Sequence, residues 1–410
     1  MLQMDSTAVE RYIHKEVAFR YQGHDLHFSL SHGLFSSHTV DTGTRHLLHM
    51  IQKHIAMDKI STVLDVGSGT GILSVSIKKA YPACEVHAID RDALACAFTA
   101  RNATGNDSPV CVHPGLDATE YEGEAPSHYD LIVSNIPAKA GLPVLERIIT
   151  NSLSRLSHDG ILACVVVSPL YEMIRDITTS RGADIIRADY HSGHVTFIAE
   201  VRDNQPAADK EFPGAYLRMR TRFALKHDKM QYTLDTVYGL PGFDTLPYAD
   251  QLCRSVFPRC EPDGTSYFWN TGQGHLPVMR LMTRYPSIEH PAVLLASRDL
   301  LSLFVSRHNI AAYFPQSRVR MIHAPDAVIS LAGEDACSLS GIYVIHDPVT
   351  GVSYRDDTDI LIKYVVKPDG VFCISGKSSS VTFMDRKNPG LVRKMKKKSR
   401  GFRADAYSTT

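Results

Sequence analysis

The stretch "LDVGSGTGI" (residues 64–72) decides the fold that this sequence predicts. It ends an apolar run at Asp65 and opens a segment of helical period through three glycines, Gly67, Gly69 and Gly71. Glycines at such a turn let the backbone bend tightly and let a ligand lie against it. A dinucleotide fingerprint needs its third glycine one position later, where Ile72 stands. The spacing therefore favours a ligand that is bound without phosphate groups.

Short runs rich in Val and Ile alternate with helical-period segments around this turn. The predicted strands are 61–67, 84–90, 129–135 and 160–168, and the predicted helices between them are 71–82, 91–104 and 141–160, the last ending at an Asp-Gly stop signal. A final strand near 191–201 closes the first unit. Such alternation is typical of an α/β fold with a parallel sheet and crossover helices.

Composition limits the function classes. The chain of 410 residues is long enough for two domains, and 44% hydrophobic and 21% charged residues are typical of a globular protein. Lys plus Arg and Asp plus Glu both number 44, so any contact with nucleic acid must come from a local patch. Eight scattered cysteines without a CxxC pair indicate reduced thiols. With no signal peptide or membrane span in the sequence, we expect a cytoplasmic protein without a membrane partner.

The chain repeats itself after a polar stretch with two prolines, which predicts a linker at 203–214. Residues 271–310 align with 68–104, and the matched pairs continue in order at a nearly constant offset, as in a duplicated domain. The pairs are Gly272 with Gly69, Gly274 with Gly71, Asp299 with Asp92, Asn309 with Asn102, Asp326 with Asp117, Asp347 with Asn135 and Gly370 with Gly160. The expected organisation is a first domain at 1–202, the linker, a second domain at 215–384 and a basic tail at 385–410.

Carboxylates at strand ends strengthen the case for a ligand in the first copy. Asp90 ends the next strand about 20 residues after the glycine turn, where a carboxylate can accept hydrogen bonds from ribose hydroxyls. Asp117 follows a further strand, the third in chain order and before 129–135, in a place to meet an adenine amino group. Each residue alone could be a helix cap or a solvated loop residue. Together with the glycine turn they predict a nucleoside-containing cofactor.

Residues 28–200 resemble the class I S-adenosylmethionine-dependent methyltransferases, and more narrowly the "methyltransferase small" domain of bacterial ribosomal RNA guanine-N2 methyltransferases. The stretch "FSLSHGLFSSHTVDTGTRHLLHMI" (28–51) resembles that family's lead-in, and "SNIPAKAG" (134–141) resembles its N-P-P-[FYW]-H-x-G loop. The family is built from two tandem copies of a Rossmann-like fold, one without a working cofactor site. In the family the degenerate copy comes first, whereas the intact glycine turn here belongs to the first copy.

The resemblance implies a role for each matching residue. Asn135 would orient the acceptor amine and Pro137 would hold the turn, as catalytic residues, while Lys139 and Gly141 would lie at the substrate. The cofactor would be S-adenosylmethionine, and the residues expected at it are Asp41, Asp65, Gly67, Gly69, Gly71, Asp90 and Asp117.

Two positions of the loop depart from the family pattern. Ile136 replaces the first proline, and Ala138 replaces the aromatic residue on which a flipped base would stack. Three explanations stay open: a base stacked by another residue, an acceptor that is not a base, or a site that binds cofactor without turnover. In the second copy, Asn270 replaces a loop glycine and Ser297 replaces Asp90, so this copy should be degenerate and serve as a scaffold.

The last 26 residues, 385–410, are strongly basic, with nine Lys or Arg against two Asp. A stretch of this kind is either a solubilising tail or a patch that contacts a polyanion. The resemblance favours RNA, and ribosomal RNA in particular, as the partner. The twenty histidines lack metal-ligand spacing, so we expect no metal. The sequence thus predicts an enzyme that methylates a guanine amine in RNA; a small-molecule or protein-nitrogen methyltransferase and a non-catalytic RNA-binding protein remain alternatives.

Overall fold

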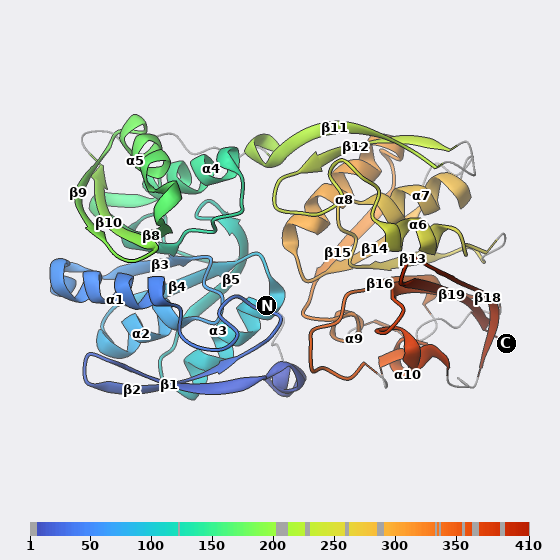
Figure 1. Ribbon diagram of the computed structural model, residues 1–410, viewed down its shortest axis with the longest axis horizontal. Coiled ribbons are helices and arrows are strands. Elements are labelled where there is room, and N and C mark those ends of the chain that lie inside the picture. Colours follow the sequence, from blue (N-terminus) through green and yellow to red (C-terminus); the bar gives the residue numbers. More distant parts are fainter. Residues whose placement is uncertain are drawn as a thin grey trace. The chain divides into compact units, whose positions relative to one another are not determined.

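The computed structural model divides into two compact units, Met1–Tyr216 and Leu217–Thr410. It describes residues 6–121, 124–201, 212–225, 230–258, 262–284, 291–332, 334–335, 338–354, 357–362, 369–385 and 390–409. Most of the expected linker, at 203–211, lies outside the described residues. Figure 1 shows each unit as strands covered by helices.

The first unit is built on one mixed sheet with the strand order β6-β5-β4-β3-β7-β8-β10-β9. Its elements are η1 (Ser6–Tyr12), β1 (Lys15–Tyr21), β2 (His24–Leu30), α1 (Thr42–His54), η2 (Met57–Lys59), β3 (Thr62–Val66), α2 (Ile72–Ala80), β4 (Glu85–Asp90), α3 (Ala93–Gly105), β5 (Cys111–Asp117), β6 (Glu120–Tyr121), β7 (Tyr129–Asn135), α4 (Leu142–Leu153), β8 (Leu156–Val167), η3 (Ser168–Leu170), α5 (Tyr171–Ser180), β9 (Ala183–Tyr190), β10 (His194–Val201) and η4 (Gly214–Tyr216).

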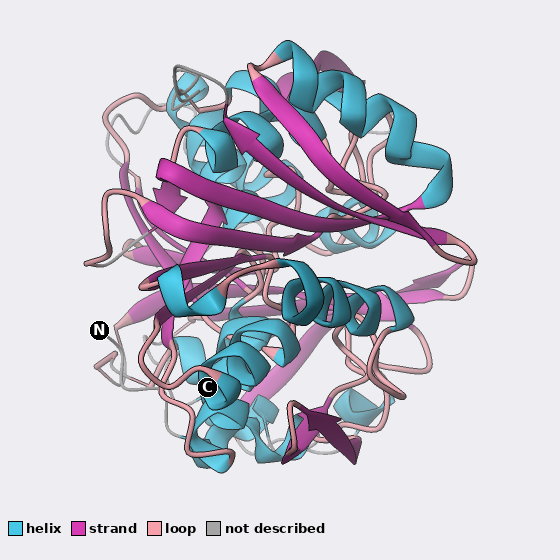
Figure 2. Ribbon diagram, turned by 90° about the vertical axis from the view of Figure 1, so that its left-hand side faces the viewer, coloured by secondary structure: helices cyan, strands magenta, loops and turns pink. Residues whose placement is uncertain are grey.

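Strands β5, β4, β3, β7 and β8 run parallel, so their carboxyl ends meet at one edge of the sheet. Helix α1 contacts α2, α2 contacts α3, and α4 contacts α5. Figures 1 and 2 show helices on both faces of the strands, the arrangement that the near-continuous apolar strands require. Because both faces are covered, loops at the carboxyl edge are the part of the sheet left open to a ligand.

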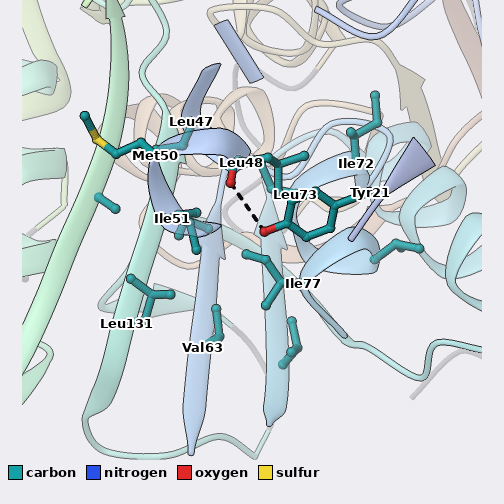
Figure 3. Close-up of a cluster of buried hydrophobic side chains, with 14 of the residues drawn as sticks. Tyr21, Leu47, Leu48, Met50, Ile51, Val63, Ile72, Leu73, Ile77 and Leu131 are labelled. Atoms are coloured by element: carbon teal, nitrogen blue, oxygen red, sulfur yellow. Dashed lines mark hydrogen bonds between the residues drawn. The ribbon is translucent and has the colours of Figure 1, made fainter. Parts of the chain in front are cut away.

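The core beneath α1 and α2 explains the position of the lead-in segment. Leu47, Leu48 and Ile51 of α1 are buried against Val63 of β3 and Ile77 of α2, as Figure 3 shows. The side chain of Asp41 caps α1 by accepting a hydrogen bond from the backbone N–H of Thr44 at 3.0 Å. Asp41 is thus the N-cap of α1, and the apolar face of this helix lies in the core.

A hairpin of β1 and β2 precedes α1 and was not predicted from the sequence. Its turn residues Gln22 and Gly23 both have positive φ, which suits a two-residue hairpin turn. The Tyr21 hydroxyl at the end of β1 donates to the Leu48 carbonyl at 3.3 Å and so attaches the hairpin to α1 (Figure 3).

The second unit repeats the first. Its sheet has the order β15-β14-β13-β16-β17-β19-β18, which matches β5-β4-β3-β7-β8-β10-β9 strand for strand, and a hairpin of β11 and β12 precedes it as β1 and β2 precede the first sheet. Its elements are β11 (Leu217–Ala224), β12 (Gln231–Val237), α6 (Tyr248–Arg254), β13 (Thr265–Trp269), α7 (His275–Arg284), β14 (Ala292–Ser297), α8 (Leu300–Tyr313), β15 (Arg318–His323), α9 (Ala327–Ser330), β16 (Leu339–His346), α10 (Asp357–Ile362), β17 (Val371–Lys377), η5 (Thr382–Asp385), β18 (Leu391–Ser399) and β19 (Phe402–Thr409).

One buried asparagine makes the same contacts in both units. Asn102 in α3 accepts from the Ser29 backbone N–H and donates to the carbonyls of Ser29 and Thr70. Asn309 in α8 accepts from the Asp235 N–H and donates to the carbonyls of Asp235 and Gln273. In each unit the side chain joins the hairpin to the glycine turn. The two tandem Rossmann-like copies predicted from the sequence are confirmed.

Two details of the prediction are wrong. Helix α4 ends at Leu153, and the expected stop signal at Asp159 and Gly160 lies inside β8, which already begins at Leu156. The basic stretch at 385–410 is not a separate tail, because β18 and β19 pair antiparallel and extend the second sheet from β17. Residues 386–389 of this stretch lie outside the described part.

Candidate functional site

The glycine turn forms an open cradle between β3 and α2. Gly67, Gly69 and Gly71 have φ values of 78°, 59° and 78°, a region that side chains disfavour. A Cβ added at Gly71 would lie 2.9 Å from the Thr99 side chain, whereas at Gly67 and Gly69 it would meet no atom within 4 Å. Gly71 is therefore required for packing against α3, and the other two glycines border free space that a ligand can use.

Asp90 is fixed beside this cradle by the backbone of two loops. Its Oδ2 accepts from the Gly69 N–H at 2.9 Å and its Oδ1 accepts from the Asp92 N–H at 2.9 Å. Burial raises the pKa of Asp90 to about 6, against the lowering effect of these hydrogen bonds. Each carboxylate oxygen keeps a second lone pair for a donor from outside, as two adjacent hydroxyl groups would provide.

Asp65 lies at the end of β3 with no exposed surface. Its Oδ2 accepts from the Ser74 N–H at 3.1 Å, while Oδ1 has no hydrogen-bond partner among the described residues. Burial raises the pKa of Asp65 to about 7. A buried carboxylate oxygen without a partner is costly. A cationic ligand group in the cradle, such as an ammonium, would satisfy this atom.

Asn135 ends β7 and is bound to the N-terminus of α1. Its Nδ2 donates to Asp41 Oδ2 at 3.0 Å and to Thr44 Oγ1 at 3.1 Å. With the amide flipped, Oδ1 would face a carboxylate oxygen and repel it. The network therefore keeps Nδ2 toward Asp41 and Oδ1 away from it. The Asn135 Oδ1 atom has no partner in the described part of the chain and is free to accept a hydrogen bond.

The rest of the loop combines a buried anchor with an exposed turn. Ile136 is 3% exposed, and its backbone N–H donates to the Val165 carbonyl at 2.9 Å. Pro137 and Lys139 are exposed, and the Pro137 carbonyl accepts from the Ala140 N–H at 3.2 Å. Gly141, with φ of 92°, is the N-cap of α4. The isoleucine that departs from the family pattern therefore packs in the core and still allows the turn.

Asp117 does not have the surroundings that the sequence suggested. It is completely buried, and its Oδ2 accepts from Arg147 Nε at 2.7 Å. Its Oδ1 accepts from Asn151 Nδ2 at 3.0 Å and from both the N–H and the hydroxyl of Thr119. The Tyr216 hydroxyl donates to the Leu116 carbonyl at 3.2 Å beside it. Because both oxygens are engaged inside the protein, these contacts indicate a structural ion pair, and the adenine contact stays a prediction.

Several residues of the site could not be singled out from the sequence. Arg147 and Tyr216 carry no motif, and Thr44 stands in the lead-in stretch without an assigned role; all three are brought in by tertiary packing. The first residue of β10 also reaches this corner, since a Cβ added at Gly43 would lie 3.0 Å from Asp41 Oδ2 and 3.1 Å from the His194 ring. A polar residue three places after the N-cap was the one available signal for Thr44.

The second unit keeps the shape of the cradle without its carboxylates. Asn270, Gly272 and Gly274 have φ values of 60°, 53° and 87°, close to those of the first turn. Ser297 stands in place of Asp90, and Phe268 stands in place of Asp65, a second loss that the sequence comparison missed. Phe268 is fully buried and stacks on Tyr343 at 5.0 Å between ring centroids. The ionic features of the first site are therefore absent from this turn.

Two absences hold for the described part of the chain. No group of three or more His, Cys, Asp or Glu side chains there is arranged to hold a metal ion. Nor does any helix in it have the length and apolar character needed to cross a membrane.

Comparisons with known proteins agree with the assignment of the first unit. Residues 25–175 match the family model of the methyltransferase small domain, which confirms the family resemblance for this segment. A ribosomal RNA small subunit methyltransferase C of Vibrio cholerae is 30% identical over 150 residues, 36% of this chain and 42% of that protein. A ribosomal protein L11 methyltransferase of Thermotoga petrophila is 31% identical over 140 residues, 34% of this chain and 49% of that protein.

A comparison of structures also covers the second unit, through similarity of fold. A solved structure of a T. thermophilus 16S rRNA N2 methyltransferase in complex with AdoMet and guanosine matches 98% of this chain and 99% of its own, with a TM-score of 0.63 and 14% identity. This likeness concerns the fold. The sequence matches above span less than half the length of the relatives they come from.

Proposed function

We propose that the first unit binds S-adenosylmethionine at the glycine turn and methylates a guanine exocyclic amine in ribosomal RNA. The observation that carries this proposal is the Asp41–Asn135 hydrogen bond, which leaves Asn135 Oδ1 free to accept a hydrogen bond at the carboxyl edge of the sheet. The cytoplasmic location expected from the sequence belongs to the same proposal.

The cradle supports the cofactor assignment. Asp90 has lone pairs available for ribose hydroxyls, and Asp65 Oδ1 needs a donor that the methionine ammonium would supply. Bound there, the cofactor supplies a methyl group already activated on a sulfonium. The protein then has to position the acceptor and exclude water.

Asn135 supplies the positioning. The nitrogen lone pair of a guanine amine is delocalised into the base, and an acceptor aimed at an N–H hydrogen helps to direct that lone pair out of the ring plane. Asn135 Oδ1 is such an acceptor, and the bonds from Nδ2 to Asp41 and Thr44 hold it in place. An amide cannot take up the proton that the amine loses, so the role of Asn135 is orientation.

A second candidate is a nitrogen in a ribosomal protein. Ala138 is exposed where the family has an aromatic residue for base stacking, and a relative at 31% identity is named for methylation of a ribosomal protein. Stacking is worth about 1 to 3 kcal/mol per base in single-strand binders, so its absence favours an acceptor other than a base.

The deciding experiment follows radioactive methyl groups from S-adenosylmethionine into ribosomal RNA, ribosomal proteins and small metabolites, using the full chain. We expect label in RNA, lost in Asn135→Ala and retained in Asp25→Ala, an exposed hairpin variant. Label in protein alone would establish the second candidate and refute the first.

A further inference from the structure

The last strands of the second unit carry a concentration of positive charge. Between residues 391 and 409 the chain has seven Lys or Arg and one Asp, although the whole protein is neutral. Six of these cations fall within residues 393–400, on β18 and the turn that follows it: Arg393, Lys394, Lys396, Lys397, Lys398 and Arg400.

Strand β18 presents these side chains to solvent. It is the last strand of its sheet and, in the described structure, pairs with β19 alone. Every residue from Val392 to Ser399 is exposed. At about 3.3 Å per residue, the cations from 393 to 400 extend over roughly 20 Å. The result is an ordered linear array of positive charge.

Nearby acids neutralise one part of the array. Lys396 Nζ lies 2.7 Å from Asp385, and Arg393 lies 3.3 Å from Asp405. Arg403 is fully buried and pairs with the same two carboxylates. These cations hold β18 and η5 together.

The other part has no compensating acid. Lys394 and Lys398 have no partner in the described part of the chain, Lys397 Nζ donates to the Ser255 carbonyl at 2.8 Å, and Arg400 lies 5.4 Å from the centre of the Tyr248 ring. None of these contacts cancels the positive charge. Four cations therefore remain for an external anion.

Lysines on an edge strand also prevent sheets from joining edge to edge. That function needs a few charges that interrupt pairing, whereas four of the six cations on β18 and its turn remain without a compensating acid. The described side chains of β18 include no aromatic residue on which a base could stack. The array therefore suits phosphate groups, which carry no sequence information.

We propose that β18 and the following turn, residues 391–400, bind the phosphate backbone of RNA and recruit it independently of sequence. The proposed ligand is a single polyanion whose phosphate groups lie along the row of Lys and Arg side chains. This inference goes beyond the proposed methyl transfer, because binding at β18 needs neither cofactor nor turnover.

The test measures RNA affinity of the full chain as a function of salt. The variant Lys394→Gln/Lys398→Gln is compared with Lys53→Gln/Lys59→Gln, which removes two exposed charges from the first unit. Two lost phosphate contacts should make the slope of log affinity against log salt shallower by about 1.4 for a single strand. The ratio of wild-type to variant affinity for RNA should then fall about sevenfold as the salt concentration rises from about 50 mM to about 200 mM.

We expect the same effect on two RNAs of unrelated sequence, a wild-type slope for the control, and unchanged thermal melting of both variants. An unchanged slope in the β18 variant, or an equal change in the control, would overturn the inference. So would binding of β18 to anionic lipid vesicles with no effect on RNA. Wild-type protein that binds RNA through β18 but transfers no methyl group to it would refute the proposed function and leave this inference standing.

Discussion

At the residue scale, Asp41 holds the Asn135 side chain, while its contact with the cofactor stays a prediction. Its Oδ2 accepts hydrogen bonds from the Asn135 amide and from the Thr44 backbone. Asp41 therefore connects the N-terminus of α1 to the loop at 134–141. If Asn135 orients the acceptor, Asp41 is the positioning residue behind it. A substitution there should therefore affect turnover more than binding.

We expect Asp41→Ala to lower kcat by up to about 100-fold, because a misplaced orienting group costs that much when reacting atoms must be aligned. KM for RNA and the affinity for cofactor should change little. Asp41→Asn, which keeps an oxygen that can accept from Asn135, should restore part of the rate. Steady-state kinetics would contradict this role if both variants raised KM and left kcat unchanged.

Asp65 makes cofactor binding dependent on pH. Its pKa of about 7 is raised by burial above the usual value near 3.9, so the ionised form destabilises the ligand-free fold. The free energy of unfolding should therefore fall as pH rises from about 4 to about 7 and then level off. A bound ammonium group favours the ionised form of Asp65. The affinity for S-adenosylmethionine should therefore fall about tenfold for each pH unit below about 7.

Calorimetric titration of S-adenosylmethionine between about pH 5.5 and about pH 8.5 checks this dependence. Asp65→Asn should bind more weakly and lose the pH dependence down to about 6, where Asp90 begins to titrate. Affinity that stays constant across this range in the wild type would exclude Asp65 as the partner of a cation.

At the element scale, the contact between β5 and α4 rests on a buried ion pair. Asp117 and Arg147 have fully buried side chains that lie 2.7 Å apart. Breaking a buried pair by removing one partner costs about 3 to 5 kcal/mol, because the other charge remains without water. We expect Asp117→Ala to lower the free energy of unfolding by this amount in chemical denaturation.

Cofactor affinity of the Asp117→Ala protein that remains folded separates the two roles of this residue. Affinity close to that of the wild type supports the ion pair. A large loss of affinity with unchanged stability would restore the adenine contact that the sequence suggested.

The sequence predicted the elements that carry strong local signals. The glycine turn and the parallel strands of the first unit lie where their patterns placed them. The hairpin β1–β2 and strand β9 were missed, since their half-exposed residues lack a continuous apolar run. Partners such as Arg147 could not be found, because they meet Asp117 through tertiary packing.

At the scale of the whole molecule, the duplicated fold carries an unequal pair of sites. The order of the strands and the asparagine that fixes each hairpin are the same in both units, while the carboxylates at positions 65 and 90 have become Phe268 and Ser297. The order of the copies, with the intact one first, is visible in the sequence. The sequence does not show that β18 and β19 belong to the second sheet, because their charge pattern resembles that of a solvated tail.

We expect one molecule of S-adenosylmethionine to bind per chain, since only the first turn has acids at these positions. Calorimetric stoichiometry checks this number, and Asp90→Ala should abolish the signal. Two sites per chain, or a site that survives Asp90→Ala unchanged, would show that the second turn binds cofactor.

The most direct measurement is nucleoside analysis of ribosomal RNA after incubation with the full chain and S-adenosylmethionine. The account predicts N2-methylguanosine with the wild type, none with Asn135→Ala, and a wild-type amount with Asp25→Ala. A methyl group on another position of the RNA, or N2-methylguanosine at an undiminished level with Asn135→Ala, would contradict it.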